Sequence, residues 1–319
     1  MQKKLNIDLY KKVYLIRAAE EKIIKHYPED DMKTPVHLSL GQEAISAGVC
    51  HSVGKSDQIF GFYRSHGVYL SLTLETDKFF AEMYGKETGI AKGKAGSMHL
   101  SSVEHNFLGS SAVVATIIPV AVGAALANKM SKNNNFVFVF VGDGAVDEGV
   151  FWESINFACL KNLPVLFVYE DNNYAIHSPA SDRHSYKSIL EIVEKFGCNI
   201  FEENTTDPEK IYNIALDAVK KSKENNMPSF LSLKYYRYLE HVGIYPDFKF
   251  GYRSEEEYKK WLEIDPVKVQ RAKLLKLYCN EIEVSEIEKS IDDQIEKSYQ
   301  YAKKSNFAPV SELYEDVFA

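Results

Sequence analysis

The chain has 319 residues, of which 45% are hydrophobic and 26% charged, a composition typical of a globular protein with a large core. Its formal net charge of −7 comes from 45 acidic against 38 basic residues, which excludes the basic surface that nucleic-acid binding requires. The 4 cysteines, Cys50, Cys159, Cys198 and Cys279, lie far apart and form no Cys-x-x-Cys pair. We therefore expect neither a disulfide framework nor a zinc site, and a reducing compartment suits the chain.

The N-terminal segment shows no targeting signal. Met1 to Tyr14 is rich in lysine but has no apolar core of about 7–15 residues, which a signal peptide needs. The longest apolar runs, such as Phe136–Val141, are too short to span a bilayer. We expect a soluble, cytoplasmic protein with neither a membrane nor a nucleic acid as partner.

The first third of the chain contains one clear helix. Apolar residues recur at helical spacing from Leu9 to His26, which predicts an amphipathic helix over about residues 7–27. The next stretch, Thr34–Gly123, is interrupted by clusters of glycine and is predicted to mix short helices with loops. Glycine clusters of this kind indicate tight turns or a backbone that approaches a ligand closely.

The centre of the chain alternates between strands and helices. Phe136–Val141 and Pro164–Tyr169 are continuous apolar runs, as expected of strands buried on both faces of a parallel sheet. A predicted helix, Glu148–Lys161, joins them. The later predicted elements are helix Ser188–Phe196, strand Cys198–Phe201, helix Pro208–Asn225 and strand Ser229–Tyr235. The pattern predicts an α/β fold with a mostly parallel sheet, in one domain (1–319) with a helical tail over about 254–319.

Two polar segments follow the two central strands. Gly142-Asp143-Gly144-Ala145 comes after the first strand, and Asp171-Asn172-Asn173-Tyr174 comes after the second. Ligands bind at the carboxyl ends of parallel strands, and a single right-handed crossover places these two loops side by side. Carboxylate, amide and carbonyl oxygens suit Mg²⁺, the glycines allow a phosphate to approach, and the helix near Glu148 directs its N-terminus toward it.

Either segment alone is more often an ordinary turn, so the specificity lies in the combination of strand, Gly-Asp-Gly, helix, strand and Asn-Asn between residues 136 and 173. Other phosphate motifs do not fit. No Gly-x-Gly-x-x-Gly follows a strand, and Gly89–Lys94 lacks the residue order of a P-loop. The combination resembles the signature of thiamine-diphosphate enzymes.

The resemblance extends over about Leu9–Pro266. It is carried by Leu15-Ile-Arg17 with Glu20-Glu21, His37–Ala44, Tyr63-Arg-Ser-His-Gly67, Gly93–Leu100 and Pro119–Ala125. Together these segments resemble the alpha subunit of the first, decarboxylating component of 2-oxo acid dehydrogenases of the pyruvate, branched-chain and acetoin types. The resemblance implies a three-layer thiamine-diphosphate-binding fold, in which helices flank a mostly parallel sheet.

The same resemblance implies roles for individual residues. The metal ligands would be Asp143, Asn172 and the carbonyl of Tyr174, and His241 would be catalytic, binding the cofactor and handling the acyl group or its protons. The implied cofactor-binding residues are Tyr63, Arg64, Ala112, Val114, Asp143, Gly144, Ala145, Asn172, Arg237 and His241. His37 and His99 lie near the substrate channel in the family pattern, and each has an equally good interpretation as a structural histidine.

The family also implies partners. Bound thiamine diphosphate would supply the electron sink for cleavage of the bond next to a carbonyl. The glutamate that activates it comes from a different domain, and family members with both domains on one chain are much longer. We therefore expect a separate beta subunit in an α2β2 assembly, with a lipoyl acyltransferase as a possible acceptor of the acyl group from a small oxo substrate.

Three departures from the family pattern leave the substrate open. The His-Gly-His-Ser loop reads Tyr238–Gly243 here, with Leu239 for the first histidine and Val242 for the serine. Ile117 replaces a glutamine, and Asn173–Ser181 is closer to the branched-chain and acetoin types. Three hypotheses remain: a 2-oxo acid or acetoin dehydrogenase, a two-chain carboligase or transketolase-like enzyme of sugar or secondary metabolism, and a non-catalytic scaffold.

Overall fold

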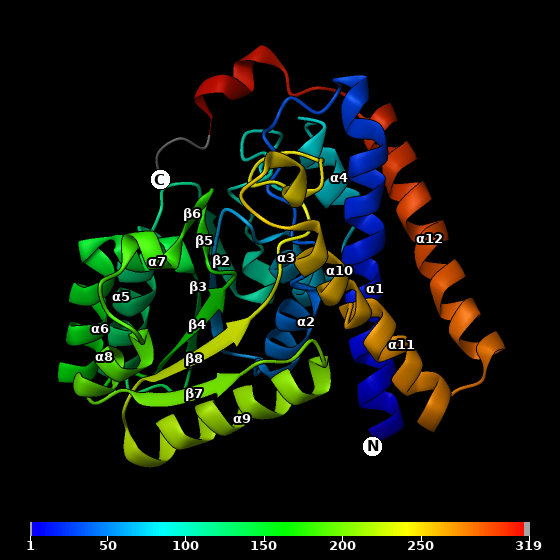
Figure 1. Cartoon of the computed structure of the whole chain (residues 1–319). Coiled ribbons are helices and arrows are strands. Elements are labelled where there is room, and N and C mark those ends of the chain that lie inside the picture. The colour runs from blue at the N-terminus through cyan, green and yellow to red at the C-terminus, as the bar shows by residue number, and fades with distance from the viewer. Residues whose placement is uncertain (1, 316–319) are drawn as a thin grey trace.

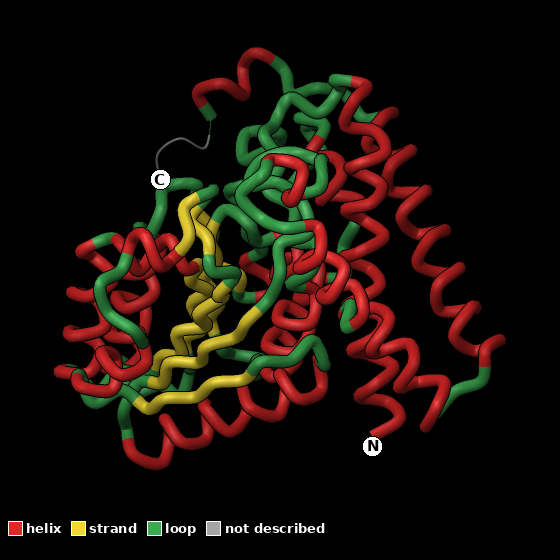
Figure 2. Tube along the Cα trace, in the orientation of Figure 1, coloured by secondary structure: helices red, strands yellow, loops and turns green. Residues whose placement is uncertain are grey.

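The structure, a computed structural model, describes residues 2–315 of the chain. Its centre is a six-stranded sheet in the order β2-β1-β3-β4-β8-β7, and every neighbouring pair is parallel (Figures 1 and 2). The strands are β1 (Gln58–Phe62), β2 (Phe107–Ser111), β3 (Val137–Gly142), β4 (Val165–Asp171), β7 (Asn199–Glu203) and β8 (Ser229–Lys234). The prediction of an α/β fold with a mostly parallel sheet flanked by helices is confirmed.

Helices cover both faces of the sheet (Figure 1). One face carries α5 (Ile117–Met130), α6 (Gly149–Leu160) and α8 (Ile189–Lys195), and the other carries α2 (Glu43–Ser52), α3 (His66–Thr73) and α9 (Pro208–Asn225). A further layer lies outside α2 and α3, where α1 (Gln2–His26) packs against α11 (Pro266–Leu277) and α12 (Glu281–Lys304). The remaining elements are α4 (Asp77–Met83), α7 (Ala180–Arg183), α10 (Glu255–Glu263), the hairpin β5 (Tyr174–Ala175) and β6 (Ser178–Pro179), and short 3-10 helices.

The sheet separates two apolar clusters, and β3 contributes to both. Phe138 and Phe140 point into the cluster beneath α1, α2 and α9. Val137, Val139 and Val141 point into the cluster beneath α5 and α6. Because successive side chains of a strand alternate between faces, a strand with apolar layers on both sides needs an uninterrupted apolar run. The prediction made from this run is therefore confirmed.

The segment 34–123 was predicted as short helices with loops, and this was wrong in part. It contains the two strands β1 and β2 and the fourteen-residue helix α5. Each strand is only five residues long and holds a glycine, Gly61 or Gly109. Gly61 belongs to the glycine clusters that indicated tight turns. Pairing of β1 with both β2 and β3 stabilises these short strands, and a single strand's sequence does not reveal such partners.

Other predicted elements differ only at their ends. The N-terminal helix begins at Gln2 rather than near residue 7, because its polar first turns pack beside α11 and α12. The tail predicted as helical over about 254–319 contains α10, α11 and α12, and the residues beyond 315 lie outside the described part of the chain. Over residues 2–315, we find no helix with the length and apolar character that crossing a membrane requires.

Arg17 fixes the N-terminal helix to two distant segments. Its Nε donates to Glu43 at 2.6 Å, and its Nη2 donates to Asp265 at 2.8 Å. Asp265 also caps the N-terminus of α11, and Glu43 accepts the backbone N–H of Gly41 at 2.9 Å. Arg17 and Glu43 belong to the motifs that carried the family resemblance, and their contacts show that they hold the framework around the site.

Candidate functional site

The two predicted loops lie side by side at the carboxyl edge of the sheet. Gly142 at the end of β3 pairs in register with Glu170 of β4, so Asp143 and Asn172 follow adjacent strand ends. The helix α6 begins at Gly149, directly beyond the first loop. A cavity of about 290 Å³ opens here, close to the size of small-molecule sites. Its walls include Tyr63, Ala112, Val114, Asp143, Gly144, Ala145, Glu148, Tyr174 and His241.

Asp143 and Asn172 form a buried pair. Asn172 donates its Nδ2 to Oδ1 of Asp143 at 3.2 Å and to the hydroxyl of Tyr235 at 3.1 Å. Its Oδ1 is buried without a hydrogen-bond partner. Burial, followed by the nearby Asp171, raises the pKa of Asp143 to about 7. A cation beside the free amide oxygen would satisfy that atom and keep the carboxylate ionised, so these residues fit a hard metal ion.

The protein supplies only part of a metal coordination shell. Among residues 2–315, no group of three histidine, cysteine, aspartate or glutamate side chains could hold a metal ion. The predicted ligands, which are the Asp143 carboxylate, the Asn172 amide oxygen and the carbonyl of Tyr174, would leave about half of an octahedral shell empty. The donor set therefore fits a metal that arrives together with phosphate oxygens, as Mg²⁺ does with a diphosphate.

A cluster of rings stands on the opposite side of the cavity. The ring of His37 lies 4.7 Å from that of Tyr63 and 5.3 Å from that of His241, between centroids. Burial, with Arg64 next, lowers the pKa of His37 to about 3 and that of His241 to about 2. Both histidines are therefore neutral near pH 7, and a neutral imidazole can accept a proton.

Two arginines contact the same ring nitrogen from behind the cavity. Arg64 Nη2 lies 3.4 Å and Arg237 Nη1 lies 3.3 Å from Nδ1 of His241. Arg64 also donates to the carbonyl of Leu38 at 2.9 Å, and Arg237 forms a buried ion pair with Asp247 at 3.1 Å. Neither guanidinium belongs to the cavity wall. Their predicted role as diphosphate contacts stays a prediction, and their observed contacts orient His241.

The apolar wall of the cavity comes from the segment that precedes α5. Ala112 and Val114 line it as expected, together with Ile117 and Met98. Ala115 adopts a left-handed conformation with φ +63° although it carries a side chain. The structure distinguishes the two histidines whose roles the sequence left open. His37 lines the cavity, whereas His99 has an exposed side chain and lies outside the cavity wall.

The structure places several residues at the site that were not identified from the sequence. Arg183 donates its Nη2 to Oδ2 of Asp143 at 3.2 Å, and its Nη1 contacts Asp147. Tyr235 orients Asn172, and Arg253 donates to Asp247 at 3.1 Å. No local motif marks these residues. A polar side chain at the end of a predicted strand, as Tyr235 is, was the one available signal.

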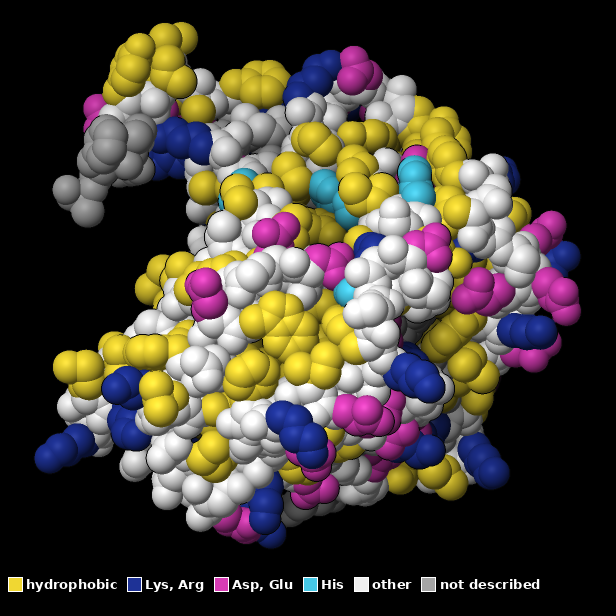
Figure 3. All heavy atoms as spheres, turned by 60° about the vertical axis from the view of Figure 1, so that its left-hand side comes forward, with side chains coloured by type: hydrophobic (Ala, Val, Ile, Leu, Met, Phe, Trp, Pro, Cys, Tyr) yellow, Lys and Arg dark blue, Asp and Glu magenta, His cyan; other side chains and the backbone are white. Residues whose placement is uncertain are grey.

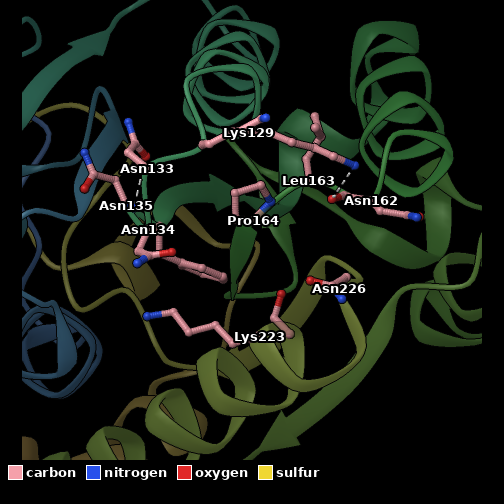
Figure 4. Close-up of a pocket in the computed structure, with 12 residues that line it drawn as sticks. Lys129, Asn133, Asn134, Asn135, Asn162, Leu163, Pro164, Lys223 and Asn226 are labelled. Carbon is pink, nitrogen blue, oxygen red and sulfur yellow. Dashed lines mark hydrogen bonds between the residues drawn. The ribbon is translucent and has the colours of Figure 1, made fainter.

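A larger cavity of about 800 Å³ lies at the opposite edge of the sheet (Figure 4). Three lysines and several asparagines line it. The helices α5, α6 and α9 all end beside it, so their C-terminal dipoles make this edge electronegative. Lys129 reaches across to donate to the carbonyl of Lys161 (the distance is 2.6 Å), as cations do at helix C-termini. Lys129 thus satisfies a helix end, and Lys223 lies over the ring of Phe136, 5.6 Å from its centroid.

Comparison with known proteins agrees with the geometry. The family model of the dehydrogenase E1 component matches residues 11–311. The pyruvate dehydrogenase E1 component subunit alpha of Rickettsia felis is 33% identical over 313 residues, covering 98% of this chain and 95% of that protein. The subunits of the same name from Porphyra purpurea and Rhizobium meliloti are 33% and 32% identical, covering 98% of this chain and 92% and 89% of theirs.

The chain therefore belongs to the dehydrogenase E1 component family. The resemblance to alpha subunits of thiamine-dependent 2-oxo acid dehydrogenases, drawn from the motifs, is confirmed, as is the prediction that the chain is an enzyme subunit.

Proposed function

We propose that the chain, as one thiamine-diphosphate-binding domain, binds thiamine diphosphate with Mg²⁺ and acts with a beta subunit in the oxidative decarboxylation of a 2-oxo acid. The observation that carries this proposal is the free, buried Oδ1 of Asn172 beside the carboxylate of Asp143. It lies where the two adjacent strands end, at the start of α6, in a chain of the dehydrogenase E1 family.

Each side of the cavity has a distinct task in this proposal. Asp143, Asn172 and the carbonyl of Tyr174 would hold the metal, and Gly144 and Ala145 would let the diphosphate approach the start of α6. When bound, the cofactor would supply the electron sink. Ala112 and Val114 would pack on its rings, Tyr63, Arg64 and Arg237 would support its diphosphate end, and neutral His241 would accept or return a proton.

The surface around the cavity supports a beta-type partner. Figure 3 shows the face that carries α5 and α6, where hydrophobic side chains are widespread and charged ones gather mainly toward the lower and right-hand edges. The exposed apolar side chains of this region are Val113, Val114, Val120, Met130, Phe157 and Leu160. Exposed apolar side chains gathered on one face favour a protein interface there. We propose an α2β2 assembly with the cofactor between the subunits, and a lipoyl acyltransferase as acceptor.

The relatives indicate the substrate class. They are named as pyruvate dehydrogenase subunits, so pyruvate is the first candidate. The comparisons favour oxidative decarboxylation over the carboligase alternative, and the intact pair of Asp143 and Asn172 argues against a scaffold that has lost its site. The four cysteines are free, which supports a cytoplasmic location.

The test uses the full chain co-expressed with a candidate beta subunit. Calorimetry should show binding of thiamine diphosphate that requires Mg²⁺, and Asp143→Ala should weaken it at least a hundredfold. The matched control is Asp182→Ala, which removes an exposed carboxylate from the short helix α7. Unchanged cofactor affinity in Asp143→Ala would refute the proposed site.

The substrate is identified by measuring the turnover of candidate substrates by the same complex, with an artificial electron acceptor. We expect turnover of pyruvate above that of branched-chain 2-oxo acids and acetoin. Product formed from two carbonyl compounds, without use of the electron acceptor, would instead establish the carboligase.

A further inference from the structure

A short hairpin carries an arginine back over the candidate metal site. β5 and β6 pair antiparallel, with Ala175 opposite Ser178, and α7 follows directly. The backbone N–H of Ala180 donates to the carbonyl of Asn173 at 2.9 Å, which closes the loop. The hairpin thus carries Tyr174, whose carbonyl is a ligand in the proposed metal site, and leads directly to Arg183, the last residue of α7.

Arg183 is held between two carboxylates. Its Nη2 lies 3.2 Å from Oδ2 of Asp143, its Nη1 contacts Asp147, and its Nε donates to the carbonyl of Ser178 at 3.2 Å. The exposed fractions of the Arg183 and Asp143 side chains are 12% and 4%. The contact is therefore a charge-assisted pair largely shielded from water, where ionic interactions are strong.

Both oxygens of the Asp143 carboxylate are already engaged. Oδ1 accepts from the neutral amide of Asn172, and Oδ2 accepts from the positive guanidinium of Arg183. A divalent cation bound to this carboxylate would stand a few ångströms from Arg183 and repel it. Metal binding without further anions must therefore weaken the Arg183–Asp143 pair. A diphosphate bound to the metal brings new negative charge to which a guanidinium fork is well matched.

We propose that Arg183 is an exchangeable counter-ion, which balances Asp143 while the site holds no cation and pairs with the diphosphate once the metal occupies Asp143. This inference rests on the proposed metal site and adds a residue that couples metal binding to diphosphate binding. Arg183 competes with the metal alone and assists the metal–diphosphate pair, so the two ligands bind together more readily than either binds separately.

The loop can exchange the side chain without unfolding, because other contacts anchor it. Arg237 donates its Nη2 to the carbonyl of Ile176 at 2.9 Å, and His184 contacts Asp147. Ile176 itself has φ +55°, a conformation rare for a β-branched residue and typical of functional loops that their surroundings hold in place. Substitution of Arg183 therefore leaves these anchors intact.

The experiment measures binding of Mn²⁺ to the full chain by electron paramagnetic resonance, first alone and then with inorganic diphosphate. Arg183→Ala should bind Mn²⁺ alone about tenfold more tightly, the equivalent of one charge-assisted hydrogen bond released from competition. At saturating Mn²⁺, the same variant should bind inorganic diphosphate about tenfold more weakly. Arg183→Lys keeps the positive charge, so both of its affinities should lie close to those of the unaltered chain.

Lys187→Ala is the matched control, since it removes an exposed positive charge from the same loop and should change neither affinity. The opposite signs distinguish a counter-ion from a structural role, because loss of loop packing would weaken both ligands together. Mn²⁺ affinity that is unchanged or lower in Arg183→Ala overturns the inference, as does unchanged diphosphate affinity. Asp143→Asn separates the two proposals: if it binds Mn²⁺ as tightly as the unaltered chain, the metal site itself is wrong.

Discussion

The hydroxyl of Tyr235 accepts a hydrogen bond from Nδ2 of Asn172 at 3.1 Å. Together with Asp143, this contact holds the amide so that its oxygen, and not its nitrogen, remains free for a ligand. Tyr235 follows β8, the strand beside β4, so the orientation of Asn172, a proposed metal ligand, depends on the neighbouring strand.

Tyr235→Phe should weaken metal-dependent cofactor binding about threefold to tenfold, because the amide loses one of two bonds that define its orientation. The unfolding free energy should change by less than about 1.5 kcal/mol. Titration calorimetry and urea denaturation measure the two quantities. Tyr236→Phe is the control, since the hydroxyl of Tyr236 is buried without a partner and its loss should leave affinity unchanged. Equal affinity losses in both variants would contradict the orientation argument.

Glu82 should be essential for the folded conformation of the loop over residues 85–96, which contains four glycines. Its carboxylate accepts backbone N–H groups of Ala91, Gly93, Ala95 and Gly96 at distances of 2.8, 3.1, 2.8 and 2.9 Å. Glu82→Gln replaces one acceptor oxygen with a donor that faces N–H groups, so we expect a loss of about 2–4 kcal/mol in the free energy of unfolding. Urea denaturation should show no comparable loss for Glu87→Gln, which alters an exposed residue of the same loop.

Ala115→Gly should leave stability unchanged or raise it by up to about 1 kcal/mol. Ala115 has φ +63°, where a Cβ is strained and glycine is not. The matched variant is Ala127→Gly on the exposed side of α5, which should lose about 1 kcal/mol because its backbone is helical. Thermal unfolding of the pair tests the difference. A similar loss in both would show that Ala115 carries no strain.

Stability should fall as pH decreases below about 6.5, where free histidine begins to bind protons. His37 is buried beside Arg64, with Arg237 and His66 also near, and these lower its pKa to about 3 in the folded chain. The unfolded chain therefore binds a proton first, and stability is lost from about pH 6.5 toward pH 3 by at most about 1.4 kcal/mol per unit. His241, whose pKa is also lowered by burial, adds a slope of the same sign.

Urea denaturation between pH 7.5 and 5.5 measures this slope. His37→Gln should make the slope shallower, whereas His99→Gln, at an exposed position, should not. A slope unaffected by His37→Gln would mean that His37 has the same pKa in the folded and the unfolded chain, which contradicts the argument.

The sequence predicted most of what lies between β3 and β8, because those strands are long apolar runs and the helices between them have regular spacing. It also predicted Asp143 and Asn172 as neighbours, since register and crossover rules place consecutive strand ends together. The short strands β1 and β2 were missed. Their pairing depends on β3, and their glycines resemble turns.

The long-range contacts at the site could not be predicted from the sequence, because they too depend on partners far away in the chain. Arg183 reaches Asp143 only because a two-residue hairpin turns the chain back, and Asp247 meets Arg237 only after an irregular loop closes. Neither turn has a regular period. The motif positions Arg17 and Glu43 were recognisable, but only their contacts show that they support the framework.

The packing of α1 against α11 and α12 has a consequence for synthesis. Arg17 contacts Asp265, and Lys3 contacts Glu283 at 3.2 Å, so α1 is stabilised by residues that are synthesised much later. At the usual rate of translation, roughly 10–50 s separate the appearance of the two partners. During that interval the side of the nascent helix that carries Ile7, Tyr10 and Tyr14 has no α11 or α12 to cover it. We infer that the ribosome-bound chain is the form of this subunit most exposed to chaperones and proteases.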